Sequence, residues 1–228
     1  MFKNKTVTIV LPAYNEDKTI SNFIKDLKSL DIYDEIIAVD NNSSDETKNE
    51  ILKSSVTYIN EVSQGFGAAL KSGLDIVKTE LILVCEPDGS FNAEDSLKLL
   101  EKSDYFDAVF TSRTNNKMPL YLKYGNIIYA KVLSLLFNGP KLNDVGSSFR
   151  LFRTEHYKIF KDTLKYQGPE FQLELTINLF KLNLNIIEIP VIYKKRVGKS
   201  NYTGNFNDSL KVAIKFTKVV IRKFLRFE

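Results

Sequence analysis

The sequence predicts an α/β fold in which helices flank a mostly parallel β-sheet. Three short apolar runs, at residues 6–11, 35–39 and 81–85, end abruptly in polar residues. Runs of this length are typical of strands that are buried on both faces of a parallel sheet. Segments with helical spacing separate them, and this alternation indicates consecutive βαβ units. Ligands of such sheets bind beyond the carboxyl ends of the strands.

The first two predicted units lie in the first fifty residues. The strand at residues 6–11 precedes a helix that carries one apolar stripe, formed by Ile20, Phe23, Ile24 and Leu27. The strand at residues 35–39 precedes a helix that Ser44 or Asp45 can cap.

The rest of the chain continues the alternation. A third helix opens at residues 63–69 and ends near Lys78. Further strands are predicted around residues 107–112 and 186–193. One further helix opens at residues 167–174, and the last helix contains residues 211–226. We expect a catalytic domain at residues 1–204 and a C-terminal amphipathic helix at residues 205–228, which either belongs to the same domain or faces a membrane.

Two carboxylates, Glu86 and Asp88, follow the apolar run at residues 81–85, and Pro87 and Gly89 shape the turn that carries them. Carboxylates at the end of a buried strand are hard oxygen ligands, which suit Mg²⁺ or Mn²⁺ on a diphosphate. The other interpretation is a solvated turn, since acidic residues and glycine favour turns in any case. The turn by itself supports both interpretations about equally.

Seven short motifs occur in series, and together they resemble those of family 2 glycosyltransferases. The resemblance runs from about residue 6 to residue 204 and rests on LPAYNE at 11–16, VDNNSSD at 39–45, GFGAA at 65–69, EPD at 86–88, TSR at 111–113, DVGSSFR at 144–150 and RVGKS at 196–200. The last three are similar to the branch that contains dolichyl-phosphate mannosyltransferases and polyprenyl-phosphate glycosyltransferases. The resemblance implies the GT-A fold, a Rossmann-like sheet flanked by helices.

The resemblance also implies a nucleotide-sugar site with Mg²⁺ or Mn²⁺ as cofactor. Glu86 and Asp88 stand where the family has Asp-x-Asp, so they are the expected metal ligands, and Ser90 replaces a nearby Gln ligand of the family. Water can complete the metal shell in its place. The residues expected to bind the nucleotide sugar are Pro12, Tyr14, Glu16, Asp40, Gln64, Gly65 and Gly67.

The acceptor implied by the resemblance is a polyprenyl phosphate, whose nucleophilic oxygen is already anionic. Such a nucleophile needs cationic groups to position it rather than a strong base. The expected phosphate contacts are Arg113, Arg150, Arg196 and Lys199. Asp144 occupies the place of a catalytic carboxylate and can orient an arginine or the sugar. Each of these cations could instead be a surface or structural ion pair, and we count Asp88, Asp144 and Arg113 as the catalytic residues.

The predicted function is therefore the transfer of a hexose from a GDP- or UDP-sugar to a polyprenyl phosphate, with inversion in a single in-line displacement. One alternative is a family 2 enzyme that acts on a lipid-linked saccharide or a polysaccharide. A second alternative is a non-catalytic module that binds nucleotide sugars. One histidine and one cysteine exclude a histidine-based triad or zinc site, and a single cysteine excludes an internal disulfide.

The charge of +4 is unevenly distributed along the 228 residues. Residues 194–228 hold ten Lys or Arg against two acids, which leaves the preceding chain negative. That acidic remainder argues against a nucleic-acid partner. A basic stripe marks the last helix: Lys211, Lys215, Lys218, Arg222 and Arg226. This pattern predicts contact with an anionic membrane, and the alternative is a core helix with a solvated basic face.

A second apolar segment, residues 118–137, is interrupted by Lys123 and Lys131. It is therefore too short to span a membrane. It could be an interfacial helix beside the lipid acceptor or a plain core or lid helix. With no spanning segment and no signal-peptide pattern, we expect a peripheral protein on the cytoplasmic face of a membrane.

Overall fold

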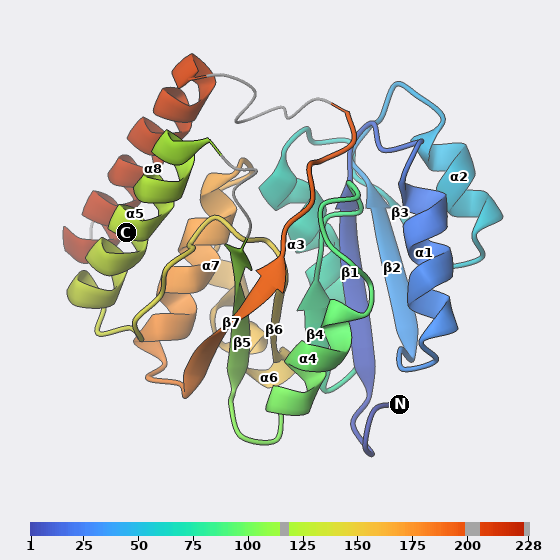
Figure 1. The fold of residues 1–228 in the computed structure, drawn as a ribbon, viewed down its shortest axis with the longest axis horizontal. Coiled ribbons are helices and arrows are strands. Elements are labelled where there is room, and N and C mark those ends of the chain that lie inside the picture. Colours follow the sequence, from blue (N-terminus) through green and yellow to red (C-terminus); the bar gives the residue numbers. More distant parts are fainter. Residues whose placement is uncertain (115–118, 199–205, 226–228) are drawn as a thin grey trace.

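A computed structural model describes residues 1–114, 119–198 and 206–225 (Figure 1). They form one seven-stranded sheet with the order β3-β2-β1-β4-β6-β5-β7. Its strands are β1 (Val7–Ala13), β2 (Glu35–Asp40), β3 (Thr57–Asn60), β4 (Leu81–Val84), β5 (Ala108–Thr114), β6 (Arg150–Arg153) and β7 (Ile186–Ile192). Only β6 runs antiparallel to its neighbours, β4 and β5, within the described sheet. The predicted mostly parallel sheet is confirmed.

Helices cover both faces of this sheet and form a three-layer α/β structure (Figure 1). One face packs against α1 (Ile20–Ser29), α2 (Thr47–Lys53) and α4 (Asp95–Lys102). The other packs against α3 (Phe66–Ile76), α5 (Leu120–Leu136), α6 (Thr154–Phe160), α7 (Glu170–Lys181) and α8 (Phe206–Leu225). A short 3₁₀ turn, η1 (Lys161–Thr163), follows α6.

The two cores arise from the alternation of side chains along each buried strand. In β1, Ile9 and Leu11 point to the α1 side, whereas Val10 points to the α3 side. Because successive side chains of a strand point to opposite faces, a strand with a layer on each face must be apolar at every position. This requirement explains the continuous apolar runs in the sequence.

The predicted helices and strands are found, with shifted boundaries. The four stripe residues of α1, Ile20, Phe23, Ile24 and Leu27, are all buried. Asp45 acts at the start of α2, where Oδ1 accepts a hydrogen bond of 3.0 Å from the Thr47 backbone N–H. The strand β6 was not among the predicted elements, and it runs antiparallel to β4 and β5.

The last helix, α8, packs against α7 and α5 (Figure 1). The Tyr129 hydroxyl on α5 lies 2.7 Å from the Ala213 carbonyl and 2.6 Å from the Thr217 hydroxyl, and Phe137 meets Phe224 edge to face. No described helix is both long and apolar enough to cross a bilayer.

Candidate active site

The carboxyl ends of β1, β2, β4 and β5 meet at one edge of the sheet, which borders a cavity of about 540 Å³. The strand-end part of its wall is charged and polar: Glu86, Asp88, Ser90, Arg113, Ser148, Lys195 and Arg196. The remaining part comes largely from α5 and α8 and is mostly apolar, with Leu122, Tyr129, Leu210, Val212, Ala213 and Phe216. The predicted metal ligands, Glu86 and Asp88, and two predicted phosphate contacts, Arg113 and Arg196, thus line one cavity. The helices α5 and α8 form the rest of its wall.

The acidic turn after β4 is held in a defined shape. The Ser90 backbone N–H donates to Asp88 Oδ1 at 2.9 Å, and Gly89 has a φ of 77°, a conformation that side chains other than glycine rarely adopt. A second segment lies across this turn. The Lys194 N–H donates to the Ser90 carbonyl at 2.9 Å and the Val197 N–H to the Asp88 carbonyl at 3.0 Å. These bonds place Arg196 directly over the acids.

Arg196 stands among three carboxylates. Its Nη2 donates to Glu16 Oε1, and its Nη1 lies 3.5 Å from Asp88 Oδ2 and 3.9 Å from Glu86 Oε2. Within the described part of this loop, Arg196 is the cation that pairs with these acids. Burial raises the pKa of Glu16 to about 8; the Arg196 charge opposes the shift, and the Asp88 and Glu86 charges add to it. Burial and the Asp88 charge also raise the pKa of Glu86.

The acidic turn fits a divalent cation held jointly with a ligand. Glu86 and Asp88 offer hard oxygens, and Arg196 joins a third carboxyl group, that of Glu16, to them. Among the described residues, no three His, Cys, Asp or Glu side chains gather closely enough to hold a metal by themselves. An ion here would therefore take its other ligands from a diphosphate and water, as is usual for Mg²⁺.

Arg113 and Asp144 form a bidentate pair beside the acidic turn. Arg113 Nε donates to Asp144 Oδ2 at 2.7 Å and Nη2 to Oδ1 at 2.8 Å. Burial would raise the pKa of Asp144, but the charge and hydrogen bonds of Arg113 outweigh it and lower that pKa. A carboxylate held in this way orients the guanidinium on the cavity wall and is poorly suited to take a proton.

Two residues that support this pair, Glu188 and Tyr193, and a third that binds Glu86, Ser148, were not predicted. Glu188, in β7, accepts hydrogen bonds from the Asn143 and Asp144 backbone N–H groups at 2.9–3.0 Å. The Tyr193 ring packs against the Arg113 guanidinium at 5.3 Å, and Ser148 hydrogen-bonds to Glu86. The signal available for Glu188 was a single acid inside the apolar run of β7.

Arg150 does not reach the cavity, which corrects its prediction as a phosphate contact. The residue begins β6 and is 1% exposed. Its guanidinium packs over the Phe110 ring at 4.3 Å. Its donors are taken by the carbonyls of Val145 and Ser147 and by the Thr176 hydroxyl, at 2.8, 2.9 and 2.5 Å. Burial lowers its pKa. Arg150 therefore holds the segment 145–147 in place and has no cavity-facing role.

The residues predicted to bind the nucleoside lie at the same sheet edge, beside the cavity rather than on its described wall. Pro12 is buried within β1, Tyr14 is half-buried, and Asp40 ends β2, where Oδ1 accepts from the Ser43 N–H at 3.1 Å. Gln64 Nε2 donates to the Asn41 carbonyl at 2.8 Å. Among these residues, Glu16 is linked to the acidic turn by Arg196, which donates to Glu16 and also pairs with Asp88.

Asn41, which was not predicted, connects two of these loops. Its Oδ1 accepts from the Gly65 N–H at 2.7 Å, and its Nδ2 donates to the carbonyls of Glu61 and Ser63 at 3.2 and 2.7 Å. Both Nδ2 bonds and the Oδ1 bond are made to backbone. Asn41 therefore fixes the loop after β3 against the loop after β2.

The two glycines of the third loop, which we expect to bind the nucleotide sugar, are also required for packing. A Cβ at Gly65 would lie 2.2 Å from the Gln167 carbonyl oxygen, and one at Gly67 would lie 2.5 Å from Phe171 Cβ. Both glycines therefore allow close packing against the segment 166–171, as in the 3.0 Å bond from the Ala68 N–H to the Gln167 carbonyl. Lys199, the remaining predicted phosphate contact, lies outside the described residues, as does Arg226.

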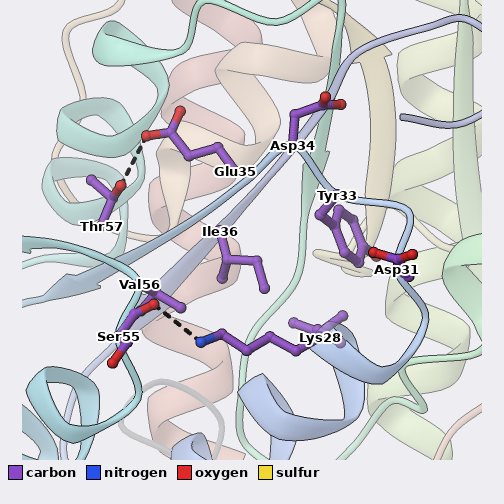
Figure 2. Close-up of a pocket in the computed structure, with 10 residues that line it drawn as sticks. Lys28, Asp31, Tyr33, Asp34, Glu35, Ile36, Ser55, Val56 and Thr57 are labelled. Carbon is purple, nitrogen blue, oxygen red and sulfur yellow. Dashed lines mark hydrogen bonds between the residues drawn. The ribbon is translucent and has the colours of Figure 1, made fainter.

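A second hollow of similar size, about 510 Å³, lies at the opposite edge of the sheet (Figure 2). It is bordered by the start of β2 and β3 and by the end of α1. Three of its charged side chains, Lys28, Asp34 and Glu35, bind nearby segments of the same chain. Lys28 Nζ donates to the Ser54 carbonyl at 2.6 Å, and Glu35 accepts from the Thr57 hydroxyl at 2.9 Å. We therefore place the active site at the carboxyl edge.

Comparison with known proteins identifies the family of the chain. The family described as glycosyl transferase family 2 matches residues 8–161, more than half of the chain. The chain belongs to glycosyl transferase family 2. The protein is thus a glycosyltransferase.

Two relatives of this glycosyltransferase have names that state a lipid acceptor. The dolichyl-phosphate hexose transferase of Haloferax volcanii is 25% identical over 225 residues, which cover 96% of each chain. The UDP-N-acetylglucosamine–dolichyl-phosphate N-acetylglucosaminyltransferase of Methanococcus voltae is 27% identical over 217 residues, which cover 82% of this chain and 85% of the relative.

Solved structures show the same fold, which confirms the GT-A prediction. Mannosyl-3-phosphoglycerate synthase from Rubrobacter xylanophilus superposes with a TM-score of 0.80 at 16% identity and covers 97% of this chain and 74% of its own. Glucosyl-3-phosphoglycerate synthase from Mycobacterium tuberculosis, crystallised with Mn²⁺ and UDP, gives 0.73 at 17% identity and covers 97% and 80%.

Proposed function

We propose that this glycosyltransferase moves a hexose from a GDP- or UDP-sugar to a polyprenyl phosphate. The observation that carries the proposal is the composition of the cavity wall. Acids and arginines line its strand-end part, and mostly apolar side chains of α5 and α8 line the rest. A prenyl phosphate has a charged head and an apolar chain, so one molecule could contact both parts. Two lipid-phosphate relatives support the same acceptor.

The donor diphosphate is proposed to bind beside the Glu86–Asp88 turn, with Mg²⁺ or Mn²⁺ held by these two carboxylates. The ion supplies Lewis-acid stabilisation of the charge that grows on the leaving diphosphate. Arg196 is placed to add a second positive charge there, because it already lies 3.5 Å from Asp88. The Mn²⁺ and UDP bound to the solved synthase are consistent with this arrangement.

The acceptor phosphate is proposed to lie by Arg113, which Asp144 fixes through two hydrogen bonds. An oxygen of the acceptor phosphate attacks the anomeric carbon, and the bond from that carbon to the donor diphosphate breaks on the opposite face with inversion. The attacking oxygen carries no proton that must be removed, so no base is needed. Asp144, whose pKa is lowered by Arg113, acts as a positioning residue.

The lipid acceptor would bring the enzyme to the cytoplasmic face of a membrane as a peripheral protein.

The test offers purified enzyme a labelled GDP- or UDP-sugar with three acceptors: a polyprenyl phosphate, the matching polyprenol and 3-phosphoglycerate. We expect transfer to the polyprenyl phosphate and a loss of transfer when EDTA removes divalent ions.

The acceptors separate the alternatives. Transfer to the polyprenol at a comparable rate, or to 3-phosphoglycerate instead of the lipid, would contradict the proposal. Transfer to none of the three, with donor hydrolysis retained, would favour a saccharide acceptor. Donor binding without hydrolysis or transfer would favour a binding module.

A further inference from the structure

The helix pair α5 and α8 exposes a set of apolar side chains, which we name the α5–α8 face. Each member is between about half and four-fifths exposed: Leu120, Tyr124, Ile128 and Leu135 from α5, and Leu210, Ile214, Ile221, Phe224 and Leu225 from α8. Most of them are three, four or seven residues from the next, which places them on one side of each helix. An apolar surface shared by two neighbouring helices is typical of an interaction site.

The structure divides α8 into three sectors rather than the two of a simple amphipathic helix. Val219, Val220 and Lys223 are buried against the protein. The apolar stripe of the α5–α8 face points away from that contact. The exposed basic residues form the third sector, beside the apolar stripe: Lys211, Lys215, Lys218 and Arg222.

Specific contacts hold α8 in this orientation. Lys223 Nζ lies 2.9 Å from Glu174 of α7, and both side chains are fully or almost fully buried. The opposite carboxylate oxygen of Glu174 accepts the backbone N–H groups of Lys165 and Tyr166 at 3.0 and 3.2 Å. On the other side, Phe224 rests on Phe137 of α5. The exposed apolar stripe is therefore displayed by a docked helix.

We propose that the α5–α8 face docks on an anionic lipid bilayer. Exposed apolar side chains can enter the interfacial region, and the adjoining basic sector complements anionic head groups. Lys123 and Lys131 on α5 add exposed positive charge next to the same surface. A second copy of the chain is a poorer occupant, because a twofold contact would bring two basic sectors together.

The face also meets the mouth of the active-site cavity. Leu210 belongs to the face, being 49% exposed, and it lines the cavity as well. This part of the inference rests on the proposed lipid-phosphate acceptor: a docked enzyme would take the prenyl chain from the bilayer without extracting it through water.

Vesicle flotation tests the inference. The wild type should float with vesicles of phosphatidylcholine containing phosphatidylglycerol at low salt, bind pure phosphatidylcholine more weakly, and lose much of the anionic preference at about 0.5 M salt. The test variant is the triple substitution Ile128→Glu, Leu135→Glu and Ile221→Glu, none of which lines the cavity. It should lower vesicle affinity at least about tenfold.

The matched control makes the same change at three equally exposed apolar positions elsewhere: Ile159→Glu, Val62→Glu and Leu52→Glu, which are 65%, 69% and 51% exposed against 61%, 80% and 50% for the test positions. The control should keep wild-type flotation. Both variants should keep transfer to a short, water-soluble prenyl phosphate, because that acceptor requires no bilayer.

Several results would overturn the inference. They are absence of wild-type flotation at low salt, equal loss in both triple variants, and a dimer that the test variant alone converts to monomer. A wild type that transfers sugar but does not float would reject docking and leave the proposed function standing. A wild type that floats through this face but uses no prenyl phosphate would support docking and reject the proposed function.

Discussion

Two hollows of nearly equal size lie at opposite edges of the sheet, with volumes of about 540 and 510 Å³. Both contain acids and a basic side chain. At the amino edge, Asp34 accepts the Val7 N–H at 2.8 Å. Lys28 donates to the Ser54 carbonyl and to the Ser55 carbonyl, the second of which Figure 2 shows. At the carboxyl edge, Arg196 faces Asp88 and Glu86 at 3.5 and 3.9 Å.

The difference lies in what the charged groups do. At the amino edge they replace missing backbone partners, so their charge is used to hold the chain together. At the carboxyl edge, acids gather on a turn that a second loop holds in place, and burial together with their mutual repulsion raises the pKa of Glu16 and Glu86. A cluster of like charges of this kind destabilises the fold and is available to a ligand. Size therefore does not distinguish an active site from a structural hollow, whereas the partners of its charges do.

The largest expected effect concerns Asp88. Asp88→Ala should lower sugar transfer at least about a hundredfold, as expected for the loss of one strong electrostatic stabiliser. The matched change at the amino edge, Asp34→Ala, should leave transfer per folded molecule unchanged. Initial rates with labelled donor measure both. Near-normal transfer by Asp88→Ala would show that the acids of the two hollows are equivalent in function.

A smaller effect on transfer is expected from Arg113→Ala, about ten- to a hundredfold, with the affinity for the donor almost unchanged. The variant leaves Asp144 buried without its main partner, so unfolding in urea should be measured to count only folded enzyme. Arg153→Ala is the control, because Arg153 pairs with Glu80 at 2.8 Å at the far edge of the sheet. An equal loss of transfer in both variants, or a parallel loss of donor binding, would contradict an acceptor role for Arg113.

The amino-edge hollow should respond in stability only. Lys28→Met removes hydrogen bonds to the Ser54 and Ser55 carbonyls, and the side chain is exposed, so we expect a loss of about 1 kcal/mol or less in the free energy of unfolding. The ratio of kcat to KM should stay at the wild-type value. A loss of transfer larger than the loss of folded protein would indicate a functional role for this hollow.

The smallest effect is a pH trend that only the carboxyl edge should show. The pKa of Glu16 is raised from 4.5 to about 8, mainly by burial. Between these values the folded state retains a proton that the unfolded chain has lost, so the stability of the wild type falls as pH rises through that window. The variant Glu16→Gln lacks the titrating carboxyl group. The free energy of unfolding of the variant minus that of the wild type should therefore increase with pH.

Urea unfolding at several pH values across this window, in metal-free buffer, measures the trend. Glu50→Gln is the control: a hydrogen bond and the charge of Lys53 lower the pKa of Glu50, so its titration falls below the window. A flat difference for Glu16→Gln, or a similar slope for Glu50→Gln, would show that the acids at the carboxyl edge are not strained by burial and mutual repulsion.

Local patterns in the sequence determined the sheet class, the α1 stripe and the acidic turn. A strand buried on both faces must be apolar throughout, and a helix with one buried face must repeat its apolar residues every three to four positions. Both rules act within a few residues, so Ile20, Phe23, Ile24 and Leu27 could be assigned to a core without any knowledge of their partners. The same holds for Glu86 and Asp88, which the chain places directly after a buried strand.

Tertiary structure alone decided which predicted groups meet. Arg196 joins Glu16 across 180 residues, and Arg150, equally basic in the sequence, is enclosed by Val145, Ser147 and Thr176. The division of α8 into buried, apolar and basic sectors likewise depends on α5 and α7. The physical reason is that the environment of a charge is set by strand order and helix packing between distant segments, and residue type does not encode it.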